Sequence, residues 1–522
     1  MRNLNLQLII LLAILAGPLK LLKAQDFLPV LSDNYMGINQ VTLQPAAIAD
    51  NRFERDFSLL GFNCDIFNDA MRYRSKWMVN PLGVLTNKKW WDENTYLDEP
   101  NGKDKNFYMS QSIMGPGFLV SIGEKHALGF TYRLRSITNT DDLIEPLFHS
   151  IYSQYEDEEH WNKWHFDDEM RSVQHIFGDY GFTYGAEVLR RGAHFLKMGL
   201  TAKILHGIAA AYVQADDLYF YYDGSEGSEA QPISWNSPYV YGGLSGNWGS
   251  YDEDGNYDYY ITYKITAKPS VGLDFGFVYE FRPNYMQYNY NVDGRKYLNR
   301  KDRNKYFLKV GFSMVDIGRL KYKKEYNSFN LAADFTPDYL QRYNSGDNSV
   351  PGNTEWLDVD KASFSFLEYV NFVDTLYQRY LTDRGVEKLD GDPGYFIMKL
   401  PTSISFQVDV KAYRFIYINL TTFTALNQGF SQVPNSHYIS NYSITPRFET
   451  KWLTVSLPVQ YNQYQKLNVG LGIRTAYVYF GITNLFSALV QDSYGLNIYI
   501  GAKLPVFQGK PRADVDNDIL GY

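Results

Sequence analysis

Apolar and polar residues alternate along the last part of the chain, between residues 467 and 504. Three consecutive segments there, 467–474, 477–483 and 496–504, carry apolar side chains at every second position. Because successive side chains of a strand leave opposite faces of the backbone, this period of two predicts β-strands. Strands of about ten residues, joined by alternately short and long connections, are typical of a transmembrane β-barrel.

The same alternation recurs upstream, and the sequence predicts fourteen strands in all. The first is expected from about Phe53 to Asp65. The other strands before residue 467 are expected around 118–122, 128–135, 182–188, 196–204, 271–281, 308–314, 404–410 and 416–420, and on both sides of residues 450–451. An even number of strands places both ends of the chain on one side of the membrane, as in single-chain bacterial barrels.

The predicted connections are short on one side of the barrel and long on the other. The short ones are 123–126, 190–193, 411–414, 450–452 and 474–476, and the long insertions are 66–106, 136–176, 207–267 and 323–396. Short periplasmic turns and long extracellular loops give this asymmetry. Residues 282–304 are the exception, because they form a long connection on the periplasmic side.

The expected fold class is therefore all-β, a transmembrane antiparallel barrel of about fourteen strands. A soluble β-sandwich or propeller also alternates, but no repeat of propeller length is visible, and a sandwich gives no reason for tight turns on one side only. The 45 Tyr, 33 Phe and 9 Trp residues and a mean hydropathy of −0.35 suit aromatic girdles around a polar lumen. The chain contains no run of about eighteen apolar residues, so its sequence predicts no membrane-spanning helix.

The first 24 residues have the pattern of a cleaved signal peptide. Arg2 precedes the apolar stretch 8–16, and residues 22–24 form an acceptable cleavage site before Gln25. We therefore expect export to the outer membrane of a Gram-negative cell. The chain has a net charge of −8, and without residues 1–24 the remaining 47 basic and 58 acidic residues give −11. This charge argues against nucleic-acid binding.

The rest of the chain divides into three expected parts. Residues 25–52 end in a proline and small residues, which favours a compact hatch or plug over a strand. Residues 53–505 form the barrel, and residues 506–522 form an acidic tail on the periplasmic side. The single Cys64 has no partner for an intrachain disulfide.

Several short motifs resemble those of the FadL-type outer-membrane barrels, which include transporters of hydrophobic compounds and secretion-associated barrels. Residues 44–46, Gln-Pro-Ala, are similar to the Asn-Pro-Ala motif that these barrels carry in a hatch before strand one, with Gln in place of Asn. The segments 203–207, 269–281 and 315–318 look like a Bacteroidota branch of this superfamily, whose members mostly lack an assigned function. The resemblance covers most of the chain after the signal peptide and implies a hatch that contains Pro45, Ala46 and Ala49.

Two long loops show helical periodicity, in residues 144–155 and 366–380. In one interpretation these helices cap the barrel mouth and bury their apolar sides against other loops. In the other they line a groove for a hydrophobic ligand, as loop helices do in the transporters that the sequence resembles. The residues expected to line this groove are Phe148, Ile151, Tyr152, Val370, Val373 and Tyr377.

Charged residues of both signs share the inward register of the predicted strands. They are Arg133, Arg135, Lys197, Lys203, Lys309, Arg474 and Lys503 with Glu187, Asp274, Glu280 and Asp409. A selective ion pore favours one sign, so we expect these charges to pair and to hold a hatch or fill the interior. Recognised metal-ligand spacings and catalytic motifs are missing, so the sequence predicts neither an enzyme nor a cofactor.

The expected function is passive transport of hydrophobic small molecules across the outer membrane. The alternative is a barrel that does not transport and acts as an adaptor or structural partner in secretion or surface assembly. The expected partners are outer-membrane lipid, lipopolysaccharide, a hydrophobic ligand, and secretion-system or surface proteins. The two functions differ in one requirement, because a transporter needs an apolar path from the loops into the lumen or through the wall.

Overall fold

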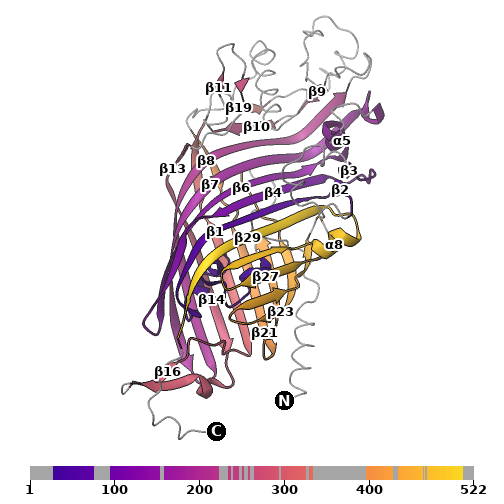
Figure 1. Ribbon diagram of the computed structural model, residues 1–522. Coiled ribbons are helices and arrows are strands. Elements are labelled where there is room, and N and C mark those ends of the chain that lie inside the picture. Colours follow the sequence, from indigo (N-terminus) through magenta and orange to yellow (C-terminus); the bar gives the residue numbers. More distant parts are fainter. Residues whose placement is uncertain are drawn as a thin grey trace, which may run out of the picture.

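The computed structural model describes residues 28–75, 95–152, 158–222, 233–236, 239–245, 250–251, 257–258, 264–292, 295–324, 329–332, 395–426, 433–462, 464 and 467–509. Fourteen antiparallel strands close into a barrel in which the first strand pairs with the last (Figure 1). Every predicted strand is present, so the predicted fold class and strand number are confirmed.

Three of the fourteen wall strands consist of two consecutive pieces. These are β4 (Lys105–Met114) with β5 (Gly117–Ile122), β24 (Leu453–Ser456) with β25 (Val459–Asn462), and β26 (Asn468–Val469) with β27 (Leu471–Thr475). The unbroken strands are β1 (Phe53–Asn68), β6 (His126–Leu143), β7 (Trp164–Arg191), β8 (His194–Tyr222), β14 (Ser270–Phe281), β17 (Leu308–Ile317), β21 (Ser403–Tyr413), β22 (Ile416–Ala425), β23 (Asn441–Glu449), β28 (Val478–Ile482) and β29 (Gly495–Phe507).

The alternation in the sequence separates an apolar outer face from an enclosed inner face. Along β14 exposed and buried side chains alternate, and Val271, Leu273, Phe275 and Phe277 point outward with 38 to 67% of their surface exposed. Similar outward residues occur on the neighbouring strands, for example Leu200 on β8. A continuous apolar belt of this kind faces lipid in outer-membrane barrels.

Among the helices in the described residues, none is long and apolar enough to cross a membrane.

Two predicted loops are wrong in extent, because the strands beside them continue beyond the membrane. β6 and β7 fill much of the predicted insertion 136–176, and β8 continues into the predicted insertion 207–267. β7 and β8 have 28 and 29 residues, whereas about ten are enough to cross the bilayer. Apolar alternation marks only the part of a strand that faces lipid, so it ends while strand pairing continues.

On the extracellular side three wall strands are extended by a separate three-stranded sheet. Its strands are β13 (Ala267–Lys268), β18 (Arg319–Lys323) and β20 (Tyr395–Lys399). The other elements on this side are β2 (Met71–Tyr73), β3 (Thr95–Leu97), α5 (Glu145–Tyr152), η4 (Glu158–His160), β9 (Ile233–Asn236), β10 (Tyr239–Leu244), β11 (Ser250–Tyr251), β12 (Tyr257–Asp258), β19 (Phe329–Ala332) and α8 (Leu485–Val490). The helix predicted over 144–155 is α5, and the one predicted over 366–380 lies outside the described residues.

The long periplasmic connection predicted at residues 282–304 is a folded hairpin. It contains the short helix η5 (Tyr285–Tyr288) and the strands β15 (Asn289–Val292) and β16 (Arg295–Asn299). β16 lies at the end of the barrel opposite the extracellular loops (Figure 1).

The N-terminal segment, residues 28–52, lies inside the barrel near its periplasmic end (Figure 1). It contains α2 (Leu28–Leu31) and two 3-10 helices, η1 (Gly37–Thr42) and η2 (Pro45–Ile48). A proline starts η2 because its fixed φ suits the first helical position and its missing N–H leaves no unpaired donor. The Gln44 side chain caps this turn by accepting a hydrogen bond from the N–H of Ala46 at 3.3 Å.

Candidate functional site

A row of three glycines on the inner wall receives the N-terminal segment. Gly185 on β7, Gly199 on β8 and Gly276 on β14 are direct neighbours across the three strands. A Cβ atom on Gly199 would collide with the backbone of Pro45, and one on Gly185 would collide with Ile48. Glycine lets the backbone of η2 lie directly against the wall, and we call these residues the glycine row.

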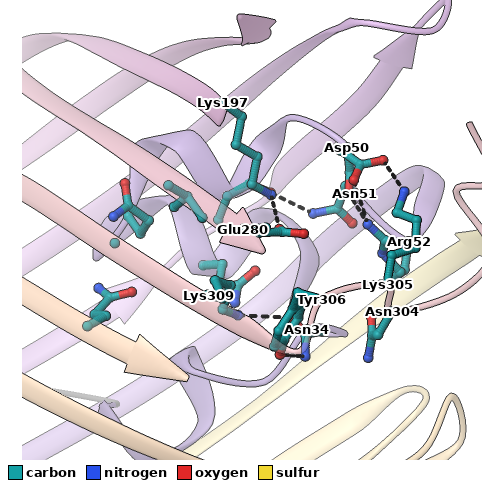
Figure 2. Close-up of a pocket in the computed structure, with 16 residues that line it drawn as sticks. Asn34, Asp50, Asn51, Arg52, Lys197, Glu280, Asn304, Lys305, Tyr306 and Lys309 are labelled. Atoms are coloured by element: carbon teal, nitrogen blue, oxygen red, sulfur yellow. Dashed lines mark hydrogen bonds and ion pairs between the residues drawn. The ribbon is translucent and has the colours of Figure 1, made fainter. Parts of the chain in front are cut away.

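The end of the N-terminal segment is held by a cluster of ion pairs. The buried carboxylate of Asp50 lies 2.6 Å from Arg282, 2.8 Å from Lys305 and 3.2 Å from Arg52. Burial alone raises the pKa of this carboxyl, but the positive charges of Lys305, Arg52 and Arg282 outweigh burial and hold its pKa well below the usual range. Figure 2 shows Asp50, Arg52 and Lys305 together in this cluster.

Wall residues anchor the rest of the N-terminal segment at several further points. Four cations with a predicted inward register take part, one through an ion pair and three through hydrogen bonds. The contacts are Arg474 to Asp33 (2.5 Å), Lys309 to the side chain of Asn34 (3.0 Å), Lys503 to the carbonyl of Tyr35 and Lys197 to the carbonyl of Ala49 (2.8 Å). The N–H of Ile38 also donates to Asp56 of β1 at 2.9 Å.

One cavity borders the N-terminal segment, and a second borders its ion-pair partners Arg282 and Lys305. The one in Figure 2 has a volume of about 30 Å³ and is lined by Gln44, Ala47 and Glu280 among others. This volume has room for about two water molecules. The second, of about 390 Å³, lies beside the periplasmic hairpin and is lined in part by Tyr285 and Tyr288.

Above the N-terminal segment, charged side chains from five neighbouring strands of the wall pair inside the barrel. They come from β6, β7, β8, β14 and β17, and we call them the central ion network. The pairs are Arg135 with Asp179 (2.7 Å) and Asp316 (2.8 Å), Arg133 with Asp179 (3.3 Å), and Lys203 with Asp316 (2.7 Å) and Asp274 (2.5 Å). All of these side chains are buried.

An extracellular loop folds into the barrel from above. Residues 435–440 of this inward loop are each at most 2% exposed. The hydroxyl of Tyr438 accepts a hydrogen bond from Arg135 at 2.7 Å and donates one to Asp316 at 3.2 Å. A nitrogen of the His437 ring lies 2.9 Å from Asp141. The inward position of this loop could not be predicted from the sequence, because a polar connection carries no periodic signal of where it packs.

Next to the central ion network and the inward loop lies a layer of apolar side chains. They belong to one buried cluster and come from β7, β8, β18, β20 and β22. We call them the apolar layer: Phe177, Leu205, Tyr212, Leu320, Tyr322, Phe396, Met398 and Phe423. The layer replaces the polar lining that a water-filled lumen has.

Of the residues predicted to line a ligand groove, only Phe148 can be placed by its side chain, and it is half-buried on α5. Glu145 anchors this helix by pairing with Lys105 at 2.6 Å and accepting the N–H of Asn101 at 2.8 Å. The side chains of Ile151 and Tyr152 and the residues Val370, Val373 and Tyr377 lie outside the described part, so the groove stays a prediction.

The residues predicted for the hatch, Pro45, Ala46 and Ala49, are all buried inside the barrel, beside the glycine row. The sequence shows the three glycines of this row only as separate inward positions of predicted strands. It does not show that they are neighbours. Within the described residues, no three His, Cys, Asp or Glu side chains are grouped in a way that would hold a metal ion.

Solved structures with a related fold are transport and other outer-membrane barrels. The toluene transporter TbuX of Ralstonia pickettii is 9% identical, with 91% of this chain and 95% of that chain covered and a TM-score of 0.36. The toluene transporter TodX of P. putida is 9% identical, with 91% and 96% covered and a TM-score of 0.38. A FadL homologue of Pseudomonas aeruginosa is 10% identical, with 89% and 93% covered and a TM-score of 0.35.

At these values the likeness carries no argument about function, and the predicted Bacteroidota branch stays a prediction. No curated protein matches the chain. A family model does match, and it covers residues 45–483, which include the start of η2, the glycine row, the central ion network and the inward loop. The chain belongs to this family, which is described as a family of unknown function, DUF5723.

Proposed function

We propose that the protein passively transports small hydrophobic molecules across the outer membrane. The observation that carries this proposal is the apolar layer, because a pore for polar solutes has a hydrated interior at this depth, whereas apolar and aromatic side chains favour an apolar solute. Phe148 on α5, with Ile151 and Tyr152, is the proposed capture site at the mouth. Val370, Val373 and Tyr377 of the second predicted helix complete it.

The molecule is expected to leave the apolar layer sideways through the wall. Straight passage would require breaking the buried pairs of the central ion network, which is costly. Beside the layer the strand pairing of the wall is irregular, because Pro269 has no N–H to pair and Gly318 separates β17 from β18. A Cβ atom on Gly272 or Gly318 would lie 3.3 or 3.2 Å from Leu205 of the layer. Glycine at these two positions therefore leaves only the backbone of the wall beside Leu205.

In this proposal residues 25–52, with Pro45, Ala46 and Ala49, act as a plug that blocks water and ions. The ion pairs of Asp50 and Asp33 support this role, because they fix both ends of the described segment to the wall. The barrel is proposed to be residues 53–505 and the periplasmic tail residues 506–522.

Uptake of the apolar fluorophore N-phenyl-1-naphthylamine by cells that carry the protein in their outer membrane tests the transport proposal. Leu205→Asn should slow uptake about tenfold, because it places an amide without a designed partner in the apolar layer. Leu205→Met is the matched control and should retain most of the rate, since its volume is similar. Both variants should keep heat-modifiable gel migration. Equal uptake by cells with and without the wild-type protein would contradict transport.

A disulfide between plug and wall separates sideways exit from passage along the axis. The Cβ atom of Ala49 lies 3.4 Å from the Cβ position of Gly185, close to the separation of about 3.5–4.5 Å in a disulfide. The variant combines Ala49→Cys and Gly185→Cys with two further substitutions. Ile48→Ala makes room for the side chain at position 185, and Cys64→Ser removes the native thiol. Sideways exit predicts equal uptake by the oxidised and reduced protein. Loss of uptake on oxidation, reversed by reduction, would show passage past the plug.

The second candidate function is a non-transporting adaptor, and the closed interior favours it. The described part of the lumen is filled from below by the N-terminal segment and from above by the inward loop. The periplasmic hairpin offers a docking surface, since Met286 is 71% and Tyr297 is 73% exposed there. A photo-crosslinking residue at position 297 tests the adaptor function. Capture of one partner protein would support it, provided that fluorophore uptake by the same cells does not depend on the barrel.

A further inference from the structure

The outward face of the sheet formed by β13, β18 and β20 is strongly basic. Its outward residues are Lys268 on β13, Arg319, Lys321 and Lys323 on β18, and Tyr395, Ile397 and Lys399 on β20. We call the five cations among them the basic patch. The inward side chains of the same strands, such as Leu320 and Phe396, are buried in the apolar layer. The pattern therefore places apolar residues inside and cations outside.

Strand register brings like charges into direct opposition within the basic patch. Lys268 lies opposite Lys321, and Arg319 lies opposite Lys399. Like charges at such cross-strand positions repel and destabilise a sheet. The ammonium groups of Lys268 and Lys321 lie 4.5 and 4.9 Å from the centre of the Tyr395 ring. The ring partly compensates the repulsion, but it brings no negative charge.

The outward face of this sheet holds no carboxylate, although the chain as a whole is acidic. Within the described residues Lys268, Lys321 and Lys323 form no ion pair. Cations that are held together on a rigid sheet without a protein counter-charge form a site for an external anion.

The basic patch lies at the extracellular edge of the lipid-facing belt. Val271 and Leu273 on β14 are 67% and 43% exposed, and Ile204 on β8 is 50% exposed beside Val271. Lys268 is three residues beyond Val271, which is about 10 Å along a strand. The side chains thus change from apolar to cationic over the distance between the acyl chains and the headgroups of the outer leaflet.

From this position and charge we infer that the basic patch binds the phosphate groups of an outer-leaflet lipid, which in an outer membrane is lipopolysaccharide. Clusters of Lys and Arg beside a hydrocarbon belt bind anionic headgroups in this way. The acyl chains of the same lipid then cover the apolar belt around Val271. The inference is independent of what the barrel transports.

Binding of diphosphoryl lipid A to the full-length barrel in detergent, measured by native mass spectrometry, tests the inference. The combined variant Lys268→Gln, Lys321→Gln and Lys323→Gln should weaken binding about a hundredfold, at roughly fivefold for each cation. Binding of lipid A without phosphates should be weak to both proteins. The wild-type complex should also weaken as salt rises.

The matched control removes three exposed cations at the periplasmic end, Lys125→Gln, Arg191→Gln and Arg414→Gln. It should bind diphosphoryl lipid A as the wild type does, and all variants should keep heat-modifiable migration. Equal binding by the basic-patch variant and the wild type would overturn the inference. Displacement of the lipid by millimolar inorganic phosphate would overturn its lipid part and identify a site for free anions.

Discussion

The substitution Asp50→Asn tests whether ion pairing holds the N-terminal segment in the barrel. Asn keeps the shape of the side chain but removes the charge that pairs with Arg282, Lys305 and Arg52. Breaking a buried ion pair from one side costs about 3–5 kcal/mol, because the partner charges stay buried without compensation. Since about 1.4 kcal/mol is a factor of ten, the undocked population should rise roughly a hundredfold to a few thousandfold.

A buried reporter thiol measures this population. Ala47→Cys in a Cys64→Ser background places the thiol beside the 30 Å³ cavity, where the added sulfur has some space. A membrane-impermeant maleimide added from the periplasmic side labels the thiol only when the segment undocks. The labelling rate should rise by the factor above when Asp50→Asn is added, while heat-modifiable migration stays unchanged.

The control for this experiment is Asp302→Asn on the periplasmic hairpin. Asp302 pairs with Arg300 at 2.7 Å and does not contact the N-terminal segment. Its loss should leave the labelling rate within about twofold of the parent, as expected for a pair that is partly exposed. If Asp50→Asn labels no faster than this control, ion pairing does not hold the segment and the argument from the cluster is wrong.

Three further predictions concern the same closed interior. Gly199→Val should also speed maleimide labelling of the thiol at position 47 while the barrel stays intact, because the new Cβ atom would collide with the backbone of Pro45. An unchanged labelling rate would refute close packing of the N-terminal segment on the glycine row. The pKa of the Asp50 carboxyl is lowered in the folded protein, so its contribution to docking is complete above about pH 4 and is lost as the pH falls through the folded pKa. Planar-bilayer conductance should therefore stay low from pH 8 to about pH 4 and rise only below it, and a rise near pH 6 would contradict this. Tyr438→Phe removes the hydroxyl between Arg135 and Asp316 and should speed cleavage of the inward loop by external protease about tenfold or more, whereas an unchanged rate would mean that other contacts hold the loop.

The barrel could be predicted from the sequence because one physical rule governs every wall strand. Lipid contacts one face of each strand, so alternations such as Val271, Leu273 and Phe275 are regular enough to count. The inward side chains carry charges of both signs, and such a lining does not select one kind of ion. The sequence therefore also predicted that these charges pair inside the barrel. The pairs of Lys203 with Asp274 and of Lys309 with Asp409 confirm that prediction.

The missed features depend on contacts between segments that are distant in the sequence. The inward loop meets Arg135 about 300 residues away, and nothing near Tyr438 in the sequence shows this pairing. The glycine row is recognised only when strand register places Gly185, Gly199 and Gly276 side by side. The strand ends beyond the membrane were missed because lipid no longer imposes a period there.

The anchoring of the N-terminal segment has a consequence for assembly of the barrel. The segment bonds to Asp56 in the first strand through Ile38, and to Lys503 in the last strand through Tyr35. β1 and β29 are also the strands whose pairing closes the cylinder. If the barrel closed before this segment was inside, either the pairing of β1 with β29 would have to break again or the segment would have to enter through one end of the closed barrel. We therefore expect the first and last strands to pair around this segment during folding, and a barrel without residues 28–52 should close more slowly.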